Sequence, residues 1–457
     1  MKFQVFEKGG RPGGTWYFNQ YPGCACDVAS YLYSYSFEYY NWSAKFAPQP
    51  EIRDYLDGVV KKYKIEENIL FNTAVNGLEW DQKLCLWKIT TTSDTFYANV
   101  IINAIGALHD PSFPDIKGSE RFQGYTVHSS AMKRDYSPDN KSIAVIGNAA
   151  SALQLVPEIA KTAKKVYIFQ RSPNWVTDKQ DYKYPQIIRA MLYYVPPLAW
   201  IHRVWLYIHN EYFYLIFFNK DSKVNQFAQT RLVMMMKQIL GDDDLVKKLT
   251  PDYPIGCKRV LISDKLEYYH ALKKSNVTLI TDPIQGISED GVSTALQKFE
   301  VDDIIYATGF HVGKFRFTIK GKDGKIVDLD TLKTSFLGVC FPDLPNFYSL
   351  LGPNTGLGHN SIIYMIECQV EFVFKMLEFQ VQKDLKSITV KKESALNWVN
   401  SLTPKFSHLV WSASCTSYYK DQKGFNYTLY PGFTFSYWGE LIRAFWQKSH
   451  HFQFHKS

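Results

Sequence analysis

Paired cysteines, basic blocks and metal-ligand clusters are all missing from this 457-residue sequence. The seven cysteines are scattered and form no CxxC pair, which predicts neither a disulfide framework nor a zinc site. We therefore expect reduced thiols in a cytoplasmic protein. The N-terminus shows no signal-peptide pattern. The net charge of +8 is spread along the chain without a zinc-finger or RNP motif, which disfavours nucleic acid as a partner.

A long apolar run free of charge is also missing. The most apolar stretch, residues 192–218, contains Pro196, Pro197, His202, Arg203 and Glu211. A membrane-spanning helix needs about 20 mostly apolar residues with few charges. We expect an aromatic, amphipathic helical pair that packs on the protein's own core. Contact with a membrane surface, or cover for an apolar pocket, is the less favoured alternative.

The C-terminal tail KSHHFQFHKS carries three histidines, but we expect a frayed terminus and no metal site. What the chain does have is the composition of a globular protein, 46% hydrophobic and 21% charged residues. Its length suits two or three domains, or one large α/β assembly with insertions.

A nucleotide-binding pattern begins at residue 141. Residues 141–146 predict a buried strand, 151–161 a helix and 166–169 a second strand. The turn between the first strand and the helix would bring backbone N–H groups to a pyrophosphate at the helix N-terminus. From this pattern we expect four residues to bind the cofactor, Gly147 and Ala149 in the turn and Ser151 and Ala152 at the start of the helix. Ala149 stands where a glycine is usual, so an ordinary crossover that binds nothing remains an alternative.

The second strand has a counterpart at the start of the chain. KFQVFEK (residues 2–8) aligns with KVYIFQR (165–171) at an offset of 163 residues, which places Glu7 opposite Gln170 and Lys8 opposite Arg171. An acid at this point accepts hydrogen bonds from ribose hydroxyls, whereas a neutral residue followed by arginine suits a 2′-phosphate. The first unit is therefore predicted to bind FAD and the second NADPH.

The repeat also predicts where the glycine loop of the first unit belongs. Gly147 lies 23 residues before Gln170, so its counterpart would lie 23 residues before Glu7 and thus ahead of Met1. We expect that the first strand, the glycine loop and the helix of the FAD unit lie outside this sequence, most simply because the gene model is incomplete. A truncated paralogue and a second chain that supplies the part are the alternatives.

Seven further segments carry a family resemblance: 13–37, 102–118, 122–133, 256–272, 302–311, 350–367 and 428–438. Together the chain resembles the flavin-dependent monooxygenases, most closely the Baeyer–Villiger monooxygenases similar to 4-hydroxyacetophenone and cyclohexanone monooxygenase. The resemblance implies an α/β fold with two Rossmann-like domains. A discontinuous FAD domain (1–140 and 313–457) would enclose an NADPH domain (141–312) with a helical insertion at 178–245.

The same resemblance implies roles for single residues. Arg259 is expected to be catalytic and Asp27 to orient it beside the flavin, while Lys258 reaches the 2′-phosphate. Phe122, Gly124 and His128 form a conformational linker between the domains. Further cofactor contacts are expected from Gly14, Thr15, Trp16, Thr308, Gly309, Asn354 and Thr355.

The expected function is an FAD- and NADPH-dependent monooxygenase that inserts one atom of O2 into a small apolar organic substrate through a C4a-peroxyflavin. Oxidation of a ketone is favoured. Met132 replaces the tryptophan of the family's linker fingerprint, which leaves oxidation of nitrogen or sulfur open. The alternative from another functional class is a paralogue that has lost catalytic activity. A pyridine-nucleotide–disulfide reductase is disfavoured because no redox-active cysteine pair lies near the flavin segment.

Overall fold

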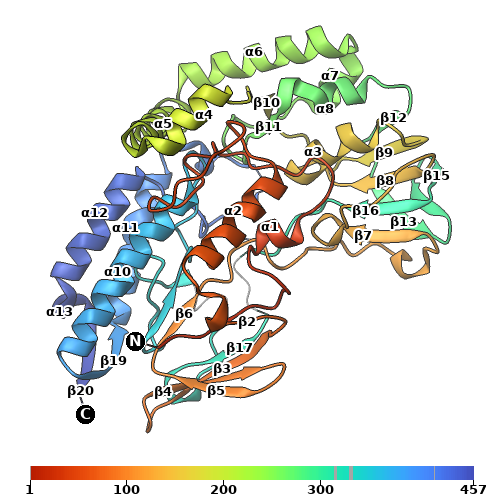
Figure 1. Ribbon diagram of the computed structural model, residues 1–457. Coiled ribbons are helices and arrows are strands. Elements are labelled where there is room, and N and C mark those ends of the chain that lie inside the picture. The colour runs from red at the N-terminus through yellow and green to blue at the C-terminus, as the bar shows by residue number, and fades with distance from the viewer. Residues whose placement is uncertain (1, 313–315, 329–332, 416, 422, 457) are drawn as a thin grey trace.

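The computed structural model describes residues 2–312, 316–328, 333–415, 417–421 and 423–456 (Figure 1). A parallel sheet with its helices lies at the right of the view, the long helices α10, α11 and α12 at the left, and a small mixed sheet at the bottom. The predicted α/β fold is confirmed.

The largest sheet has five parallel strands in the order β12 (Val277–Ile280), β9 (Lys165–Phe169), β8 (Ser142–Ile146), β16 (Asp303–Tyr306) and β7 (Tyr125–His128). Helix α3 (Ala150–Ile159) follows β8 and leads into β9. The predicted strand–turn–helix–strand unit is confirmed, with both strands within one residue of their expected starts. The sheet also takes in β7, which precedes the predicted domain boundary at 141.

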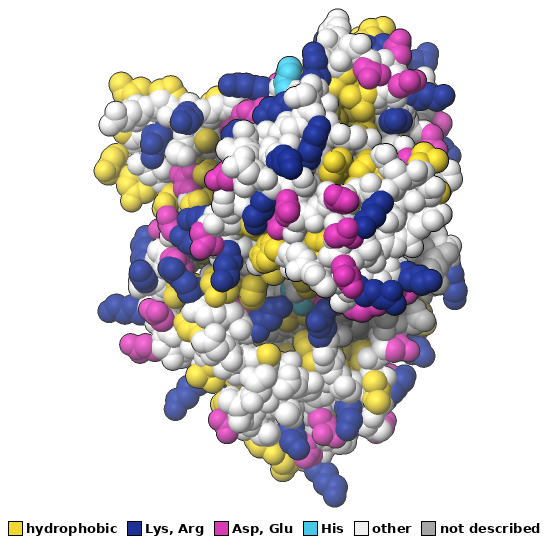
Figure 2. All heavy atoms as spheres, turned by 90° about the vertical axis from the view of Figure 1, so that its right-hand side faces the viewer, with side chains coloured by type: hydrophobic (Ala, Val, Ile, Leu, Met, Phe, Trp, Pro, Cys, Tyr) yellow, Lys and Arg dark blue, Asp and Glu magenta, His cyan; other side chains and the backbone are white. Residues whose placement is uncertain are grey.

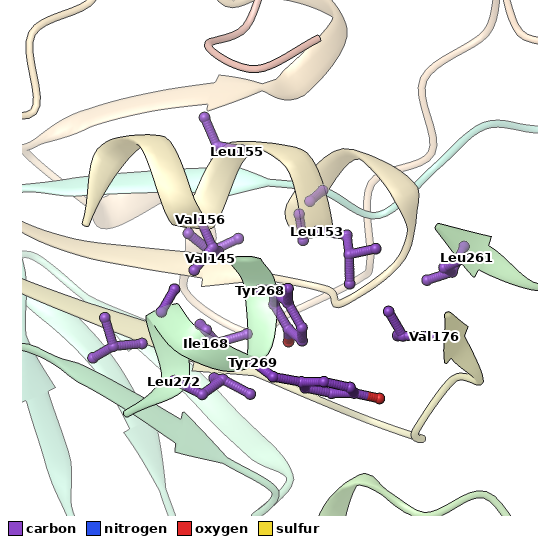
Figure 3. Packing of buried hydrophobic residues seen from close by; sticks show 14 of the residues in the cluster. Val145, Leu153, Leu155, Val156, Ile168, Val176, Leu261, Tyr268, Tyr269 and Leu272 are labelled. Atoms are coloured by element: carbon purple, nitrogen blue, oxygen red, sulfur yellow. The ribbon is translucent and has the colours of Figure 1, made fainter. Parts of the chain in front are cut away.

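Both faces of this sheet are covered, as the almost continuous apolar run of β8 predicts. Ile143 and Val145 face α3 and α8 (Glu267–Leu272), and Figure 3 shows Val145 and Ile168 beneath these helices. Ala144 and Ile146 face the opposite side, where an antiparallel meander covers them. The meander consists of β13 (Ile284–Ser288), β14 (Gly291–Thr294) and β15 (Lys298–Glu300).

The first nucleotide unit contains two separate parallel pairs. β1 (Val5–Phe6) pairs with β2 (Ile69–Leu70), and β18 (Phe347–Ser349) pairs with β6 (Ile101–Asn103). β1 is shorter than the predicted strand at 3–6. Val5 and Ile102 in these pairs are exposed, as is Phe3 just before β1. A four-stranded sheet lies below, in the order β17 (Thr318–Lys320), β3 (Val75–Asp81), β4 (Leu86–Thr91) and β5 (Thr95–Ala98).

Three long helices from the C-terminal part of the chain form a second core. It contains α10 (Ile362–Gln382), α11 (Lys392–Phe406) and α12 (Thr434–Trp446). After α13 (Lys448–His451), the tail forms β20 (Phe452–Lys456), which pairs antiparallel with β19 (Leu385–Val390). The expectation of a frayed terminus was therefore wrong: Phe452 and Phe454 pack on the helices and hold the tail in place. Among the described residues, no group of histidines, cysteines or carboxylates could hold a metal ion.

The helical insertion consists of α4 (Gln186–Tyr194), α5 (Pro196–Phe217), α6 (Lys223–Leu240) and α7 (Asp243–Leu249). The two prolines that interrupt the apolar run start α5, a position where proline is favourable. One face of α5 packs on the core through Ala199, Leu206 and Tyr214, as expected. In the described part of the chain, no helix is long and apolar enough to cross a membrane.

Ile305 tests the packing of the five-stranded sheet, because its side chain is fully buried at the centre of β16. Ile305→Ala should lower the free energy of unfolding by about 2–5 kcal/mol through lost burial and the cavity left behind. Denaturant unfolding measures this change. Leu296→Ala, at an exposed turn, is the control and should change it by less than about 0.5 kcal/mol. Equal effects of the two substitutions would contradict the packing described.

Candidate functional site

The turn after β8 brings the second nucleotide unit close to its neighbouring strand. Gly147 has φ of 109°, and a β-carbon there would lie 2.4 Å from the carbonyl oxygen of Ala307. The glycine is therefore required by the approach of the two strands. Ala149 is the N-cap of α3 and has no side chain that could bond the first N–H groups of the helix. Ser151 and Ala152 lie in the first turn, where the helix dipole favours an anion.

Gln170 is held in the protein by both ends of its amide. Its Oε1 accepts a hydrogen bond of 2.7 Å from Asn148 Nδ2, and its Nε2 donates to the carbonyl oxygen of Lys248 at 2.7 Å. A carboxylate would lose the donor and face that carbonyl oxygen with negative charge. Gln170 is the neutral residue that the sequence predicts to distinguish this unit from the first one. Its two hydrogen bonds show that its surroundings also require a neutral amide.

Lys258 and Arg171 form a cationic pair beside this turn. Lys258 Nζ donates to Ser172 Oγ at 3.0 Å and lies 4.8 Å from the centre of the Tyr253 ring. Burial lowers the pKa of Lys258, the neighbouring charge of Arg171 lowers it further, and the negative charge of Asp252 raises it in part. Within the described ranges, no carboxylate lies within ion-pair distance of either cation. Two cations without a paired acid fit a phosphate group, which is what a 2′-phosphorylated dinucleotide would place here.

Asp27 and Arg259 meet although 232 residues separate them. Arg259 donates to Asp27 Oδ2 from Nε at 2.9 Å and from Nη2 at 2.5 Å. Each side chain keeps about a third of its surface exposed, 33% for Arg259 and 29% for Asp27. The negative charge of Asp27 is the main cause that raises the pKa of Arg259. The guanidinium is thus oriented by the carboxylate and still accessible to a ligand.

Helix α3 also holds the segment that carries Asp27. Gln154 Oε1 accepts from Tyr21 Oη at 3.0 Å and from the backbone N–H of Ala25 at 3.3 Å. Its Nε2 donates to the carbonyl oxygen of Ala25 at 3.0 Å. The predicted NADPH unit and the predicted flavin segment are therefore joined two residues before Asp27.

The residues predicted for the flavin side lie at a strand end and a short helix. Glu7 follows β1, its Oε1 accepts from the N–H of Gly9 at 2.6 Å, and burial raises its pKa. Gly14 has φ of 48° and starts α1 (Thr15–Phe18). Trp16 Nε1 donates to Tyr33 Oη at 3.2 Å. Glu7 thus follows β1 as Gln170 follows β9, and its contact with a ribose stays a prediction.

His128 connects the end of β7 to the loop after β16. Its Nε2 is 3.0 Å from the carbonyl oxygen of Gly309, which can only accept, so Nε2 carries the proton. Its Nδ1 then accepts from the backbone N–H of Ser130 at 3.1 Å. Burial lowers the pKa of His128 and favours this neutral form. Thr308, beside Gly309, donates to the carbonyl oxygen of Ser112 at 2.5 Å.

The other predicted linker residues have packing roles. At Gly124 a β-carbon would lie 2.1 Å from the carbonyl oxygen of Asp302 and 2.6 Å from the ring of Phe122, so only glycine fits. Met132 is buried in the core around α3. These positions and the hydrogen bonds of His128 fit a linker that holds the end of β7 against the loop after β16.

Asn354 and Thr355 are fully buried, and their hydrogen bonds run into the protein. Asn354 Nδ2 donates to the carbonyl oxygens of Asn426 and Leu429, at 2.8 and 3.1 Å, and Thr355 Oγ1 donates to that of Gly352 at 2.6 Å. The prediction that these two side chains contact the flavin gains no support from their hydrogen bonds, which favour a role in holding the turn. Asn354 Oδ1 is buried without a hydrogen-bond partner.

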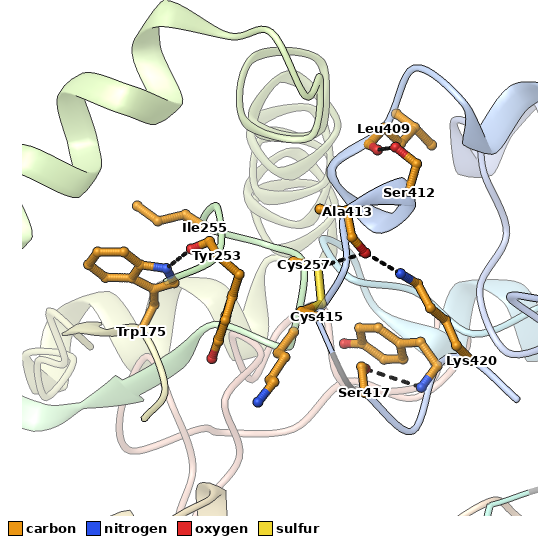
Figure 4. Close-up of a disulfide and its surroundings, with 12 residues drawn as sticks. Trp175, Tyr253, Ile255, Cys257, Leu409, Ser412, Ala413, Cys415, Ser417 and Lys420 are labelled. Carbon is orange, nitrogen blue, oxygen red and sulfur yellow. Dashed lines mark hydrogen bonds between the residues drawn. A yellow bond between two sulfur atoms is a disulfide. The ribbon is translucent and has the colours of Figure 1, made fainter. Parts of the chain in front are cut away.

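The expectation that all cysteines are reduced was wrong. Cys257 and Cys415 form a disulfide, and Figure 4 shows it beside Tyr253 and Lys420. The other five cysteines are free. The bond ties the segment of Lys258 and Arg259 to the C-terminal part of the chain. No spacing rule could have found it, because 158 residues separate the two cysteines.

Comparison with known proteins extends these findings. A family model described as pyridine nucleotide-disulphide oxidoreductase matches residues 33–194. A Baeyer-Villiger monooxygenase of Pseudomonas aeruginosa is 37% identical over 98% of this chain and 86% of its own length. The FAD-binding monooxygenase ktnD of Aspergillus niger is 37% identical over 97% of this chain and 76% of its own. The solved structure of OTEMO in complex with FAD and NADP has a TM-score of 0.91 and 25% identity, covering 99% of this chain and 95% of that one.

The disulfide predicts the number of reactive thiols. Unfolded without reductant, the protein should show five thiols, and after reduction seven. A thiol-reactive dye or mass spectrometry counts them. In the chain-entropy model, closing a 158-residue loop stabilises the fold by up to about 5 kcal/mol, so Cys257→Ser should lower the melting temperature. Cys85→Ser, at a free cysteine, is the matched control. Seven thiols in unreduced protein would contradict the bond.

Proposed function

Because the chain belongs to the Baeyer–Villiger-type family of flavin-dependent monooxygenases, we propose that it oxidises a ketone to an ester by inserting one oxygen atom from O2. It is an oxidoreductase that uses FAD and NADPH. The small, apolar ketone is the part of the proposal that goes beyond family membership.

The ion pair of Asp27 and Arg259 is the single observation that carries the proposal. Insertion next to a carbonyl builds negative charge on the former carbonyl oxygen, and an oriented guanidinium stabilises that charge. The pair leaves part of Arg259 exposed to a ligand, while Asp27 fixes its orientation through two hydrogen bonds. Asp27 acts as a positioning residue and Arg259 as the catalytic one.

When bound, FAD reduced by NADPH activates O2 and transfers one oxygen atom to the substrate. This chain's residues would hold the two cofactors. Arg171 and Lys258 would bind the 2′-phosphate, and the N-terminus of α3 the pyrophosphate. Glu7 would accept hydrogen bonds from the ribose of FAD. His128, through its hydrogen bond to Gly309, would keep the linker in register with the loop at the end of β16.

Arg259→Ala tests the proposed chemistry. The variant, with FAD added, should lose about 10²–10³-fold in kcat/KM for ester formation from a cyclic ketone, the typical cost of one missing oxyanion donor. Its oxidation of a thioether should fall much less, because attack by sulfur develops no carbonyl oxyanion. Gas chromatography of the two products, with NADPH consumption as a second readout, measures both reactions.

Asp27→Asn is the matched variant, since it keeps the guanidinium but weakens its orientation. We expect a loss smaller than that of Arg259→Ala. Ester formation at the wild-type rate by Arg259→Ala would remove Arg259 from the mechanism. A wild-type protein that makes sulfoxide and no ester would replace the ketone with a soft sulfur or nitrogen substrate.

The cationic pair predicts selectivity between coenzymes. Combined substitution of Arg171 and Lys258 by alanine should raise the Kd for NADPH about 10–100-fold, the value of one or two charged hydrogen bonds, and leave the Kd for NADH within about twofold. Titration of nucleotide fluorescence measures binding without turnover. Arg121→Ala, at an exposed arginine, is the control. An equal loss for both nucleotides would contradict a 2′-phosphate site.

A further inference from the structure

Helix α5 carries a second apolar face that no part of the described chain covers. Its members recur at helical spacing, with i, i+4, i+7, i+11 and i+14 on one side of the helix. Each of them is between 57% and 60% exposed. They are Ile201, Trp205, Ile208, Tyr212 and Leu215, and we name this set the insertion stripe. The exposed residues of α5 include no lysine, arginine, aspartate or glutamate.

The neighbouring helix α4 adds to the same feature. Ile187, Met191 and Tyr194 follow the spacing i, i+4 and i+7 and are exposed as well. Trp205 is stacked between the rings of His202 and His209, with ring centres 6.2 and 5.6 Å away. Figure 2 shows hydrophobic side chains gathered on a lobe at the upper left, at the height of α4 and α5 in Figure 1. Exposed apolar side chains gathered in this way are typical of an interaction surface.

On the side of α5 opposite the insertion stripe, two charged side chains make hydrogen bonds to the rest of the protein, which keeps the stripe facing outward. Glu211 is buried and accepts hydrogen bonds of 2.6 Å from Thr434 Oγ1 and from Asn360 Nδ2. Arg203 donates to the carbonyl oxygens of Tyr31 and Ser34 at 2.7 and 2.8 Å. Rolling α5 inward would break these bonds and bury charges without partners. The exposure of the insertion stripe is therefore built into the fold.

From α4 to the end of α6 the chain is richer in cations than in acids, although Asp181 precedes this stretch and Asp242, Asp243 and Asp244 follow it. Residues 182–240 contain seven lysines and arginines but only two acids, Glu211 and Asp221, and Glu211 is buried. Five of the cations are exposed. Lys237, near the end of α6, pairs with Asp243 at 3.2 Å, which leaves Lys183, Lys220, Lys223 and Arg231 for the rim. Such a cationic rim attracts an anionic surface and repels a copy of itself across a two-fold axis.

We propose that the insertion stripe docks on a lipid bilayer that carries anionic headgroups. Tryptophan and tyrosine favour the boundary between headgroups and acyl chains, and Trp205 and Tyr212 lie on the stripe. Lysines at the end of α5 and the start of α6 contact the headgroups, while α5, about 33 Å long, lies flat on the surface. The helix lies on the bilayer without crossing it, in agreement with the lack of a spanning helix among the described residues.

Vesicle flotation of the full chain tests the proposal. The protein should float with vesicles of phosphatidylcholine and phosphatidylserine at 7:3, and at least about tenfold less with pure phosphatidylcholine. Trp205→Ser combined with Ile208→Ser should abolish flotation, because the helix loses apolar area at the bilayer. Lys220→Gln combined with Lys223→Gln should weaken binding to the anionic vesicles about fivefold per cation.

Leu296→Ser and Trp446→Ser are the matched controls, since both residues are exposed and lie outside the insertion stripe. They should float like the wild type, and circular dichroism should show that every variant is folded. Wild-type protein that stays unbound to the anionic vesicles would overturn the proposal. A dimer in sedimentation velocity that Trp205→Ser with Ile208→Ser converts to monomer, without any vesicle binding by the wild type, would assign the surface to a second copy.

Discussion

The hydrogen-bonded ion pair of Asp27 and Arg259 is the contact on which the candidate site depends. It joins two segments that the sequence assigns to different nucleotide units, and each segment is itself held in place. Gln154 fixes the backbone two residues before Asp27, and the disulfide of Cys257 lies two residues before Arg259. A guanidinium held in this way is preorganised, and in the proposed reaction it would stabilise a developing charge with little loss of freedom.

Local patterns in the sequence predicted the second nucleotide unit well. The apolar run of β8, the helical spacing of α3 and the following strand lie next to each other, so their periodicity alone identifies them. The contact of Asp27 with Arg259 was predicted from resemblance and not from any local pattern, and the structure shows it. Gln154 and the pair of Cys257 and Cys415 were missed, because contacts between residues more than a hundred positions apart leave no local signal.

The insertion shows a different limit of sequence reasoning. The run at 192–218 is apolar on two sides of the helix, and its pattern cannot tell which side the protein covers. That choice depends on Glu211 and Arg203, whose partners come from distant segments near residues 31–34, 360 and 434. The C-terminal tail was misjudged for a similar reason: Phe452 and Phe454 find their neighbours on α10 and β19.

The disulfide between Cys257 and Cys415 closes a covalent ring that includes the meander, β16, β18 and helices α10 and α11. A protease that cuts one peptide bond inside this ring leaves both fragments attached to each other. The nicked molecule therefore stays in one piece, heavier by one water, until a reductant opens the bridge, and Arg259 stays tethered to the C-terminal fragment.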